Sequence, residues 1–196
     1  MNNQIQQADV VIIGAGPSGA VAASLLVNKG WRVVVLEQQV FPRFSIGESL
    51  LPQCMHFLAE ANLAESVKEQ ADTLGFQFKN GAAFQRRGEH TAIDFTEKFT
   101  QGPGTTFQVK RADFDKCLAD GAMEQGAEIR YQHSVIEYTD HGDGALLTVD
   151  DEKNQRYQIK GQFVLDASGF GRVLPRLLDL ETPSNFPVRW AYFSHF

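Results

Sequence analysis

Apolar residues near the start of the chain predict a strand, a helix and a second strand. Residues 10–13 form a continuous β-branched run, which is typical of a central parallel strand buried on both faces. Small and apolar residues then recur at helical spacing over residues 17–29, and Gly30 follows where a C-terminal cap would lie. Residues 31–36 form a second buried run. The pattern therefore predicts a βαβ unit.

The middle of the chain combines helical and strand-like patterns. Apolar residues at helical spacing predict helices over 48–61, 63–71 and 111–125. Short alternating runs separated by Gly, Pro and Thr predict strands at 76–78, 83–85, 93–95 and 107–109. We therefore expect residues 72–110 to form an antiparallel β segment inserted into a larger fold.

Strand patterns dominate the rest of the chain. Strands are predicted at 129–131, 135–138, 146–149 and 157–159, around a turn at 141–144. A further buried strand at 163–165 ends in a short polar turn. No clear linker interrupts the chain, so we expect one domain over residues 1–196.

A glycine-rich turn follows the first predicted strand directly. Residues 14–19 read Gly-Ala-Gly-Pro-Ser-Gly and fit the pattern G-x-G-x-x-G. In this pattern the Gly14 position makes the turn, the Gly16 position lets the backbone approach a pyrophosphate, and the Gly19 position packs the helix on the strand. Backbone N–H groups at the start of the helix then face the phosphates. The turn predicts a dinucleotide site.

Glu37 ends the second predicted strand of this unit. Its carboxylate can accept hydrogen bonds from both hydroxyls of an adenosine ribose and repels a 2′-phosphate, which favours FAD or NAD over NADP. The motif does not separate FAD from NAD. The alternative is a glycine turn in another α/β protein, with Glu37 as a solvated strand end.

These elements together predict an α/β fold class. We expect a Rossmann-like FAD/NAD(P)-binding fold with a parallel central sheet. An antiparallel β crossover and the inserted antiparallel β segment complete the expected fold.

Composition and charge exclude several classes of partner. The net charge is −6 and no basic stretch stands out, so we expect no nucleic-acid partner. The first apolar run is short and ends in glycine, which predicts no signal peptide and no membrane span, and hence a cytoplasmic location. Cys54 and Cys117 lack C-x-x-C spacing, and the histidines lack ligand spacing. We therefore assign no disulfide framework and no metal site.

Four segments resemble a known family. Residues 9–37 resemble the opening of the flavoprotein monooxygenase superfamily, and residues 41–52, Phe-Pro-Arg-Phe-Ser-Ile-Gly-Glu-Ser-Leu-Leu-Pro, resemble the stretch that follows it in flavin-dependent halogenases. Residues 109–115 and 166–172 are similar to two further segments of that family. The resemblance implies that the cofactor is FAD and that the chain is the N-terminal part of an FAD-dependent oxidoreductase.

The resemblance also implies positions for the cofactor. Glu37 would hold the ribose, Arg43 and Arg111 would lie along the phosphate and ribose region, and residues 45–49 would approach the isoalloxazine ring. The Val135 backbone and the turn after residue 165 would lie near the adenine half. The candidate cofactor-binding residues are Gly14, Gly16, Pro17, Ser18, Gly19, Glu37, Arg43, Ser45, Ile46, Gly47, Ser49, Arg111, Val135, Asp166, Ala167 and Gly169.

Lys79 is the one catalytic candidate. Residues 75–84 are similar to the halogenase segment that carries a lysine in the substrate chamber. The family mechanism implies that reduced FAD and O₂ form a C4a-hydroperoxyflavin, that halide is oxidised to hypohalous acid, and that a lysine keeps this oxidant beside the substrate. The alternative is a lysine at the solvent end of a hairpin strand.

Two expected features of a complete halogenase are missing from the sequence. Nothing matches the W-x-W-x-I-P segment, because Trp31 and Trp190 stand alone, and the G-D strand end near the ribityl chain is missing. Both normally follow in the C-terminal half of such enzymes, so we expect the chain to be incomplete.

Three hypotheses follow for the function. The first is a halogenase acting on an aromatic or pyrrolic small molecule, and the second is a related FAD-dependent reductase or hydroxylase, such as a geranylgeranyl-reductase-like enzyme. The third is an inactive FAD-binding fragment. No second dinucleotide motif is present. Reducing equivalents are therefore expected from a separate flavin reductase or from NAD(P)H.

Overall fold

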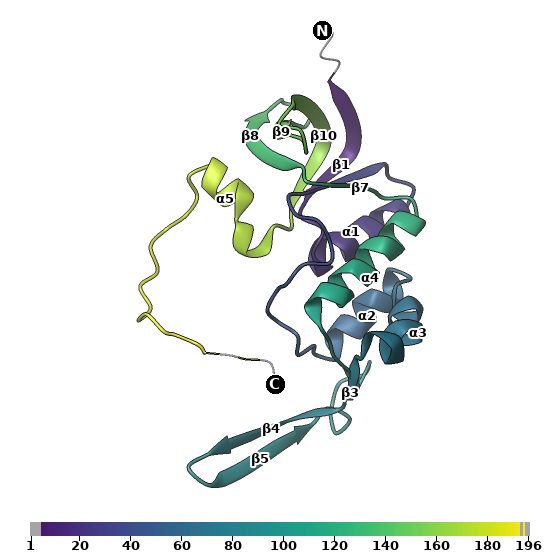
Figure 1. Ribbon diagram of the computed structural model, residues 1–196, viewed down its shortest axis with the longest axis vertical. Coiled ribbons are helices and arrows are strands. Elements are labelled where there is room, and N and C mark those ends of the chain that lie inside the picture. Colours follow the sequence, from purple (N-terminus) through teal and green to yellow (C-terminus); the bar gives the residue numbers. More distant parts are fainter. Residues whose placement is uncertain (1–4, 193, 195–196) are drawn as a thin grey trace.

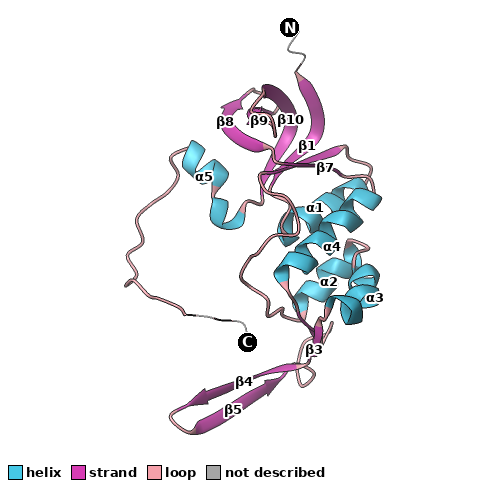
Figure 2. Cartoon of the chain, in the orientation of Figure 1, coloured by secondary structure: helices cyan, strands magenta, loops and turns pink. Residues whose placement is uncertain are grey.

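A six-stranded sheet forms the centre of the computed structural model, which describes residues 5–192 and residue 194 (Figures 1 and 2). The strand order is β7-β2-β1-β10-β9-β8, and the first four strands run parallel. The last two are antiparallel to their neighbours. The strands are β1 (Gln6–Ile13), β2 (Val33–Glu37), β7 (Glu128–Tyr131), β8 (Ser134–Asp140), β9 (Ala145–Asp150) and β10 (Arg156–Asp166).

Helices cover one face of this sheet, as Figure 2 shows. Helix α1 (Pro17–Val27) packs against α4 (Arg111–Glu124), and α2 (Gln53–Glu60) and α3 (Ala64–Leu74) lie beyond them. Apolar side chains of β1 and β2 pack with small residues of α1 and α4 in the larger core cluster. The smaller cluster lies on the other face, where Val11 and Leu36 pack with residues of β9 and β10.

Four short strands lie outside the central sheet. Strand β3 (Gln77–Lys79) pairs with β6 (Thr106–Gln108), and β4 (Gly81–Arg86) pairs with β5 (Glu89–Asp94). The β4-β5 hairpin projects away from the helices in Figure 1, and every residue of β5 is exposed. These strands fall within residues 72–110, the segment predicted to be an insertion. That this segment is an insertion with these boundaries stays a prediction.

The predicted fold class is confirmed, because a parallel-dominated sheet carries the βαβ unit and an antiparallel crossover. Two local predictions were wrong. The helix expected from residue 48 begins only at Gln53. Ser49 pairs with Gln108 instead, and a residue that precedes a proline, as Leu51 does, disfavours helical backbone angles. The strands expected at 157–159 and 163–165 are one strand, β10, which lies between β9 and β1; pairing with β9 runs from Arg156 to Gly161, and pairing with β1 runs from Ile159 to Asp166.

A short 3₁₀ turn (Gly169–Gly171) and α5 (Val173–Leu177) follow the sheet. The sequence patterns did not predict either element. Within the described residues, none of the helices combines the length and the apolar character needed to cross a membrane.

Candidate cofactor site

A cleft of about 580 Å³ opens at the carboxyl ends of the parallel strands. Ile13 ends β1, Glu37 ends β2 and Ala167 follows β10, and all three line it. In open α/β sheets ligands bind at this edge of the sheet. The predicted cofactor residues that line the cleft are Gly14, Gly16, Pro17, Ser18, Glu37, Arg43, Ser45, Ile46, Arg111, Val135, Ala167 and Gly169.

The three glycines of residues 14–19 differ in what surrounds them. Gly14 has a φ of +96°, and a Cβ there would lie 2.8 Å from the Ala167 carbonyl oxygen. A Cβ on Gly19 would lie 1.9 Å from the Gly14 oxygen, so that glycine lets α1 pack on β1. A Cβ on Gly16 would meet only the Arg43 Nη2 atom, at 3.6 Å. Gly16 therefore borders open space in the cleft, as a pyrophosphate requires.

The start of α1 faces this space without a side-chain cap. Its N-cap residue is Gly16 and its first residue is Pro17, which has no N–H group to satisfy. The partial positive charge of a helix N-terminus favours an anion. This local structure fits the phosphates of a dinucleotide.

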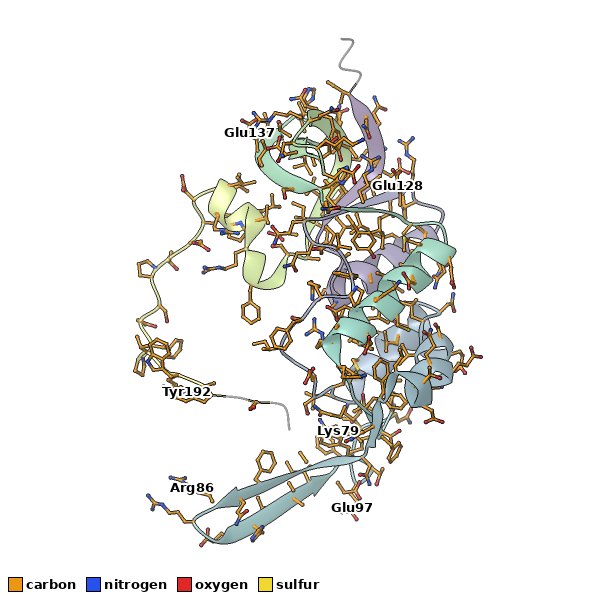
Figure 3. All side chains as sticks on the ribbon, viewed as in Figure 1. Lys79, Arg86, Glu97, Glu128, Glu137 and Tyr192 are labelled. Carbon is orange, nitrogen blue, oxygen red and sulfur yellow. The ribbon has the colours of Figure 1, made fainter. Side chains whose placement is uncertain are left out.

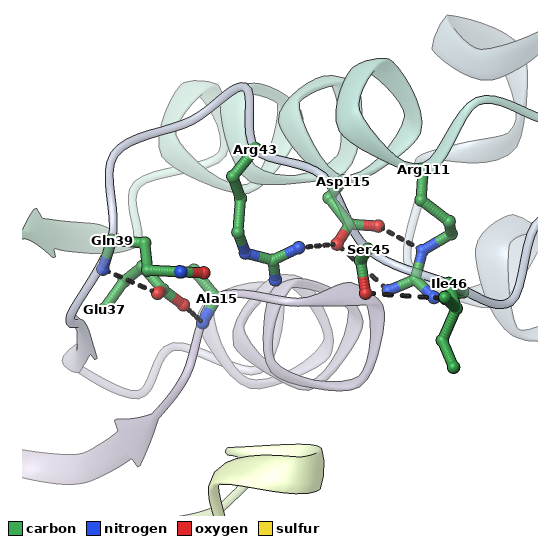
Figure 4. Close-up of polar contacts among 8 residues, drawn as sticks. All are labelled: Ala15, Glu37, Gln39, Arg43, Ser45, Ile46, Arg111 and Asp115. Atoms are coloured by element: carbon green, nitrogen blue, oxygen red, sulfur yellow. Dashed lines mark hydrogen bonds and ion pairs between the residues drawn. The ribbon is translucent and has the colours of Figure 1, made fainter.

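Glu37 is 5% exposed, and both of its carboxylate oxygens accept backbone hydrogen bonds (Figure 4). The Ala15 N–H donates to Oε2 at 2.8 Å and the Gln39 N–H donates to Oε1 at 2.9 Å. Each carboxylate oxygen has a further lone pair. Glu37 thus fixes the glycine loop and keeps acceptor capacity for ribose hydroxyls.

Burial, and then the nearby carboxylates of Asp120 and Glu37, raise the pKa of Tyr131 to about 12.

A buried carboxylate connects the two predicted arginines (Figure 4). Asp115 has a side chain with no exposed surface, and Arg43 Nη1 donates to its Oδ2 at 3.0 Å. Arg111 donates from Nε to Oδ1 at 2.7 Å and from Nη2 to Oδ2 at 3.0 Å. One negative charge therefore orients two positive charges, and the group keeps a net positive charge beside the cleft. The sequence analysis missed Asp115, although it follows Arg111 by one helical turn, a spacing at which side chains pair.

Arg111 also holds the segment expected at the isoalloxazine ring. Its Nη1 donates to the Ile46 carbonyl at 2.6 Å. Gly47 has a φ of +92°, and a Cβ there would lie 3.0 Å from the same Nη1 atom. Ser45 and Ile46 line the cleft, whereas Gly47 supports the turn behind them.

The turn after β10 is braced by Asp166. Its carboxylate accepts hydrogen bonds from the Ser168 N–H at 2.9 Å and from the Leu174 N–H at 2.8 Å. Ala167 and Gly169 of the turn line the cleft, but Asp166 does not. Gly19, Gly47, Ser49 and Asp166 are therefore the predicted cofactor residues that surround the cleft without lining it.

The cleft is also lined, beside Glu37, by polar residues that the sequence analysis did not name. His133 and Ser134 precede Val135 there, and Gln38 and Gln39 follow Glu37. The imidazole Nδ1 of His133 lies 2.8 Å from the Tyr131 carbonyl oxygen. No residue pattern in the sequence marks His133 and Ser134, because they approach Glu37 only when β7 pairs with β2.

Lys79 lies outside the cleft, at the end of β3 and near the base of the β4-β5 hairpin (Figure 3). Its Nζ donates to Ser49 Oγ and to the Leu50 carbonyl oxygen, each at 2.7 Å. The ammonium thus contacts the chain that continues from the cleft-lining residues 43–46. Among the residues the structure describes, no group of three or more His, Cys, Asp or Glu side chains has an arrangement suited to a metal ion.

Comparison with known proteins agrees with this geometry. Residues 7–192 match the FAD binding domain family. The flavin-dependent halogenase armH1 of Armillaria mellea is 33% identical, over 86% of this chain and 33% of that protein. The 1H-pyrrole-2-carbonyl-peptidyl-carrier-protein brominase of Pseudoalteromonas luteoviolacea is 33% identical, over 89% of this chain and 40% of that protein. The chain therefore spans less than half the length of either relative.

Solved structures share the fold. A flavoprotein/dehydrogenase from Cytophaga hutchinsonii superposes with a TM-score of 0.88 and 44% identity, over 93% of this chain and 44% of that one. The OxyS anhydrotetracycline hydroxylase from Streptomyces rimosus superposes with a TM-score of 0.77 and 28% identity, over 93% of this chain and 36% of that one. The resemblance seen in the sequence is confirmed: the chain belongs to the FAD-binding domain family of flavin-dependent halogenases and FAD monooxygenases, and its cofactor is FAD.

Proposed function

We propose that the protein is a flavin-dependent halogenase that uses reduced FAD, O₂ and halide to halogenate an aromatic or pyrrolic small molecule. The observation that carries the proposal is the Lys79 ammonium, which contacts Ser49 and Leu50 of the segment that continues from the cleft. The halogenase and brominase relatives support the same reaction. When bound, reduced FAD with O₂ supplies the oxidant that converts halide into hypohalous acid.

Different residues of this chain would bind the cofactor and orient the segment beside it. The start of α1 and Arg43 would hold the pyrophosphate, and Glu37 would accept the ribose hydroxyls. Arg111 would fix residues 45–47 beside the isoalloxazine ring through its bond to the Ile46 carbonyl.

Lys79 would act on the oxidant. An ammonium can donate a hydrogen bond to hypohalous acid, and a neutral amine can take the halogen from hypohalous acid to form an N-halo amine and release water. Either role keeps a diffusible oxidant in one place, beside the substrate carbon that it attacks.

A halogenation assay tests the proposal. The full-length protein is incubated with FAD, a flavin reductase, NADH, O₂, bromide and a small phenol or pyrrole as substrate, and a parallel reaction contains monochlorodimedone, which traps free hypobromous acid. We expect a brominated phenol or pyrrole, and the variant Lys79→Met should lose that product while bromination of monochlorodimedone persists, because the oxidant still forms without the lysine. Lys98→Met is the matched control, because Lys98 donates to the Thr100 and Gly102 carbonyls of a surface loop. Wild-type halogenation by Lys79→Met would contradict the proposed role of Lys79.

A hydroxylase is the second candidate. It is favoured by the fold shared with the OxyS anhydrotetracycline hydroxylase. In that case, bromide would leave no halogenated product, and NADH oxidation would be coupled to an oxygenated product. The same assay therefore separates the two functions.

A further inference from the structure

Three groups surround the Lys79 ammonium. Ser49 Oγ and the Leu50 carbonyl oxygen accept its hydrogen bonds at 2.7 Å, and the Phe95 ring centroid lies 5.3 Å from Nζ. Bonds from an ammonium to oxygen are among the stronger hydrogen bonds, and an aromatic ring face attracts a cation at this distance. We call Ser49, Leu50 and Phe95 the Lys79 cradle.

Backbone pairing holds two members of the cradle, Ser49 and Leu50, independently of the lysine. Ser49 forms an antiparallel bridge with Gln108, and the Leu50 N–H donates to the Phe107 carbonyl at 3.3 Å. Strand β6, which contains Gln108, pairs with β3 on its other side. Lys79 therefore reaches across β6 to a backbone that is already in place, and the direction of its side chain is set by these acceptors.

Ser49 and Leu50 of the cradle continue the chain that lines the cofactor cleft. Ile46 lines the cleft and its carbonyl is held by Arg111, and Ser49 follows three positions later. The ammonium is consequently held against the segment that continues from the cleft, although its own backbone belongs to β3, next to the exposed hairpin. Of the two hydrogen-bond acceptors, only Ser49 uses a side chain, so only Ser49 can be altered by substitution without removing the backbone.

We propose that Ser49 is the positioning residue for Lys79, and that its hydroxyl fixes the ammonium beside the segment that continues from the cofactor cleft. Phe95 contributes the ring face on which the ammonium rests. The Ser49 hydroxyl accepts the lysine hydrogen bond and stays uncharged because it keeps its own proton. Ser49 therefore restricts the position of the ammonium without cancelling its positive charge. The inference rests on the proposed function of Lys79, but its geometry is measurable without turnover.

The experiment follows the Lys79 ammonium by NMR in protein labelled with ¹⁵N-lysine. Lys79→Met identifies the signal by removing it. Ser49→Ala should shift the signal and speed its hydrogen exchange with water about tenfold, the size expected for one lost charge-assisted bond. Ser49→Thr, which keeps the hydroxyl, should restore both. Phe95→Leu should remove the ring-current contribution to the shift and leave the Ser49 bond intact.

Activity provides the second readout. In the halogenation assay Ser49→Ala should lower the rate of halogenation of a bound substrate about tenfold, again for one lost charge-assisted bond, and Ser49→Thr should recover it. A Lys79 signal with unchanged shift and exchange rate in Ser49→Ala would overturn the inference. If Lys79→Met halogenates like the wild type, the proposed function fails instead, and the NMR result is unaffected by that failure.

Discussion

Replacing Asp115 by Asn tests whether one buried carboxylate builds the arginine side of the cofactor cleft. The side chain has no exposed surface, and it accepts three hydrogen bonds from Arg43 and Arg111, which are each less than a fifth exposed. Asparagine has nearly the same shape but offers only one acceptor oxygen, and its NH₂ group faces the guanidinium groups. Two positive charges then lose their shared partner.

Breaking a buried ion pair by removing one partner costs roughly 3–5 kcal/mol. Because asparagine keeps one acceptor, we expect the free energy of unfolding to fall by about 3 kcal/mol, at the lower end of that range. The affinity for FAD should fall as well, because Arg43 loses its orientation toward Gly16 and Arg111 its anchor beside Ile46. A loss of about 2 kcal/mol in binding corresponds to a dissociation constant roughly 30-fold higher.

Urea unfolding followed by circular dichroism measures the first quantity, and quenching of flavin fluorescence measures the second. Asp120→Asn is the matched control on the same helix, because Asp120 and its partner Lys116 are both partly exposed and such an i,i+4 pair contributes about 0.5 kcal/mol or less. Asp115→Asn with the unfolding free energy and FAD affinity of the control would refute the argument that Asp115 organises the two arginines.

Gly19→Ala should lower the free energy of unfolding by about 3 kcal/mol or more, because its Cβ would lie 1.9 Å from the Gly14 oxygen and would force α1 away from β1; an unchanged urea midpoint would contradict this. Glu37→Gln should cost about 1–3 kcal/mol of stability, since an amide NH₂ replaces one acceptor facing the Ala15 or Gln39 N–H, and it should also weaken FAD binding in a fluorescence titration. Stability should decline as pH rises from 10 to 12, because burial raises the Tyr131 pKa from 10.0 to about 12, so that the unfolded chain loses this proton first. Below pH 10 the contribution of Tyr131 is complete, and Tyr131→Phe should make the decline in urea midpoint between pH 10 and 12 shallower; an identical slope would count against the assignment.

The βαβ unit and the central sheet were predictable because their signals are local. The run over residues 10–13, the glycines of the turn and Glu37 each specify backbone geometry within a few residues. The order of the elements then determines a right-handed parallel crossover. These are the parts of the fold on which the cleft depends.

The errors arose where distant pairing overrides the local pattern. Residues 48–52 have helical spacing, but Ser49 and Leu50 pair instead with β6, and the helix starts at Gln53. Strand β10 was predicted as two runs, but its pairing with β9 over residues 156–161 and its pairing with β1 over residues 159–166 overlap and make it one strand, which the sequence does not show.

Part of the candidate site was also beyond sequence reasoning. The polar residues His133 and Ser134 enter the cleft only through the pairing of β7 with β2. Asp115 was within reach, because its one-turn spacing from Arg111 is visible in the sequence, but its bond to Arg43 spans 72 positions. The roles of the predicted cofactor residues and of Lys79 stay predictions until ligand binding and turnover are measured.

An FAD titration of the wild type against Gly16→Ala tests the central claim most directly. A Cβ at Gly16 clashes with no backbone, so the variant should keep the unfolding free energy within about 1 kcal/mol, the usual cost of alanine at a helix N-cap. The same methyl group projects into the space assigned to the pyrophosphate. The account predicts saturable quenching of flavin fluorescence by the wild type and its loss in Gly16→Ala. Equal binding by both proteins, or no binding by the wild type, would contradict it.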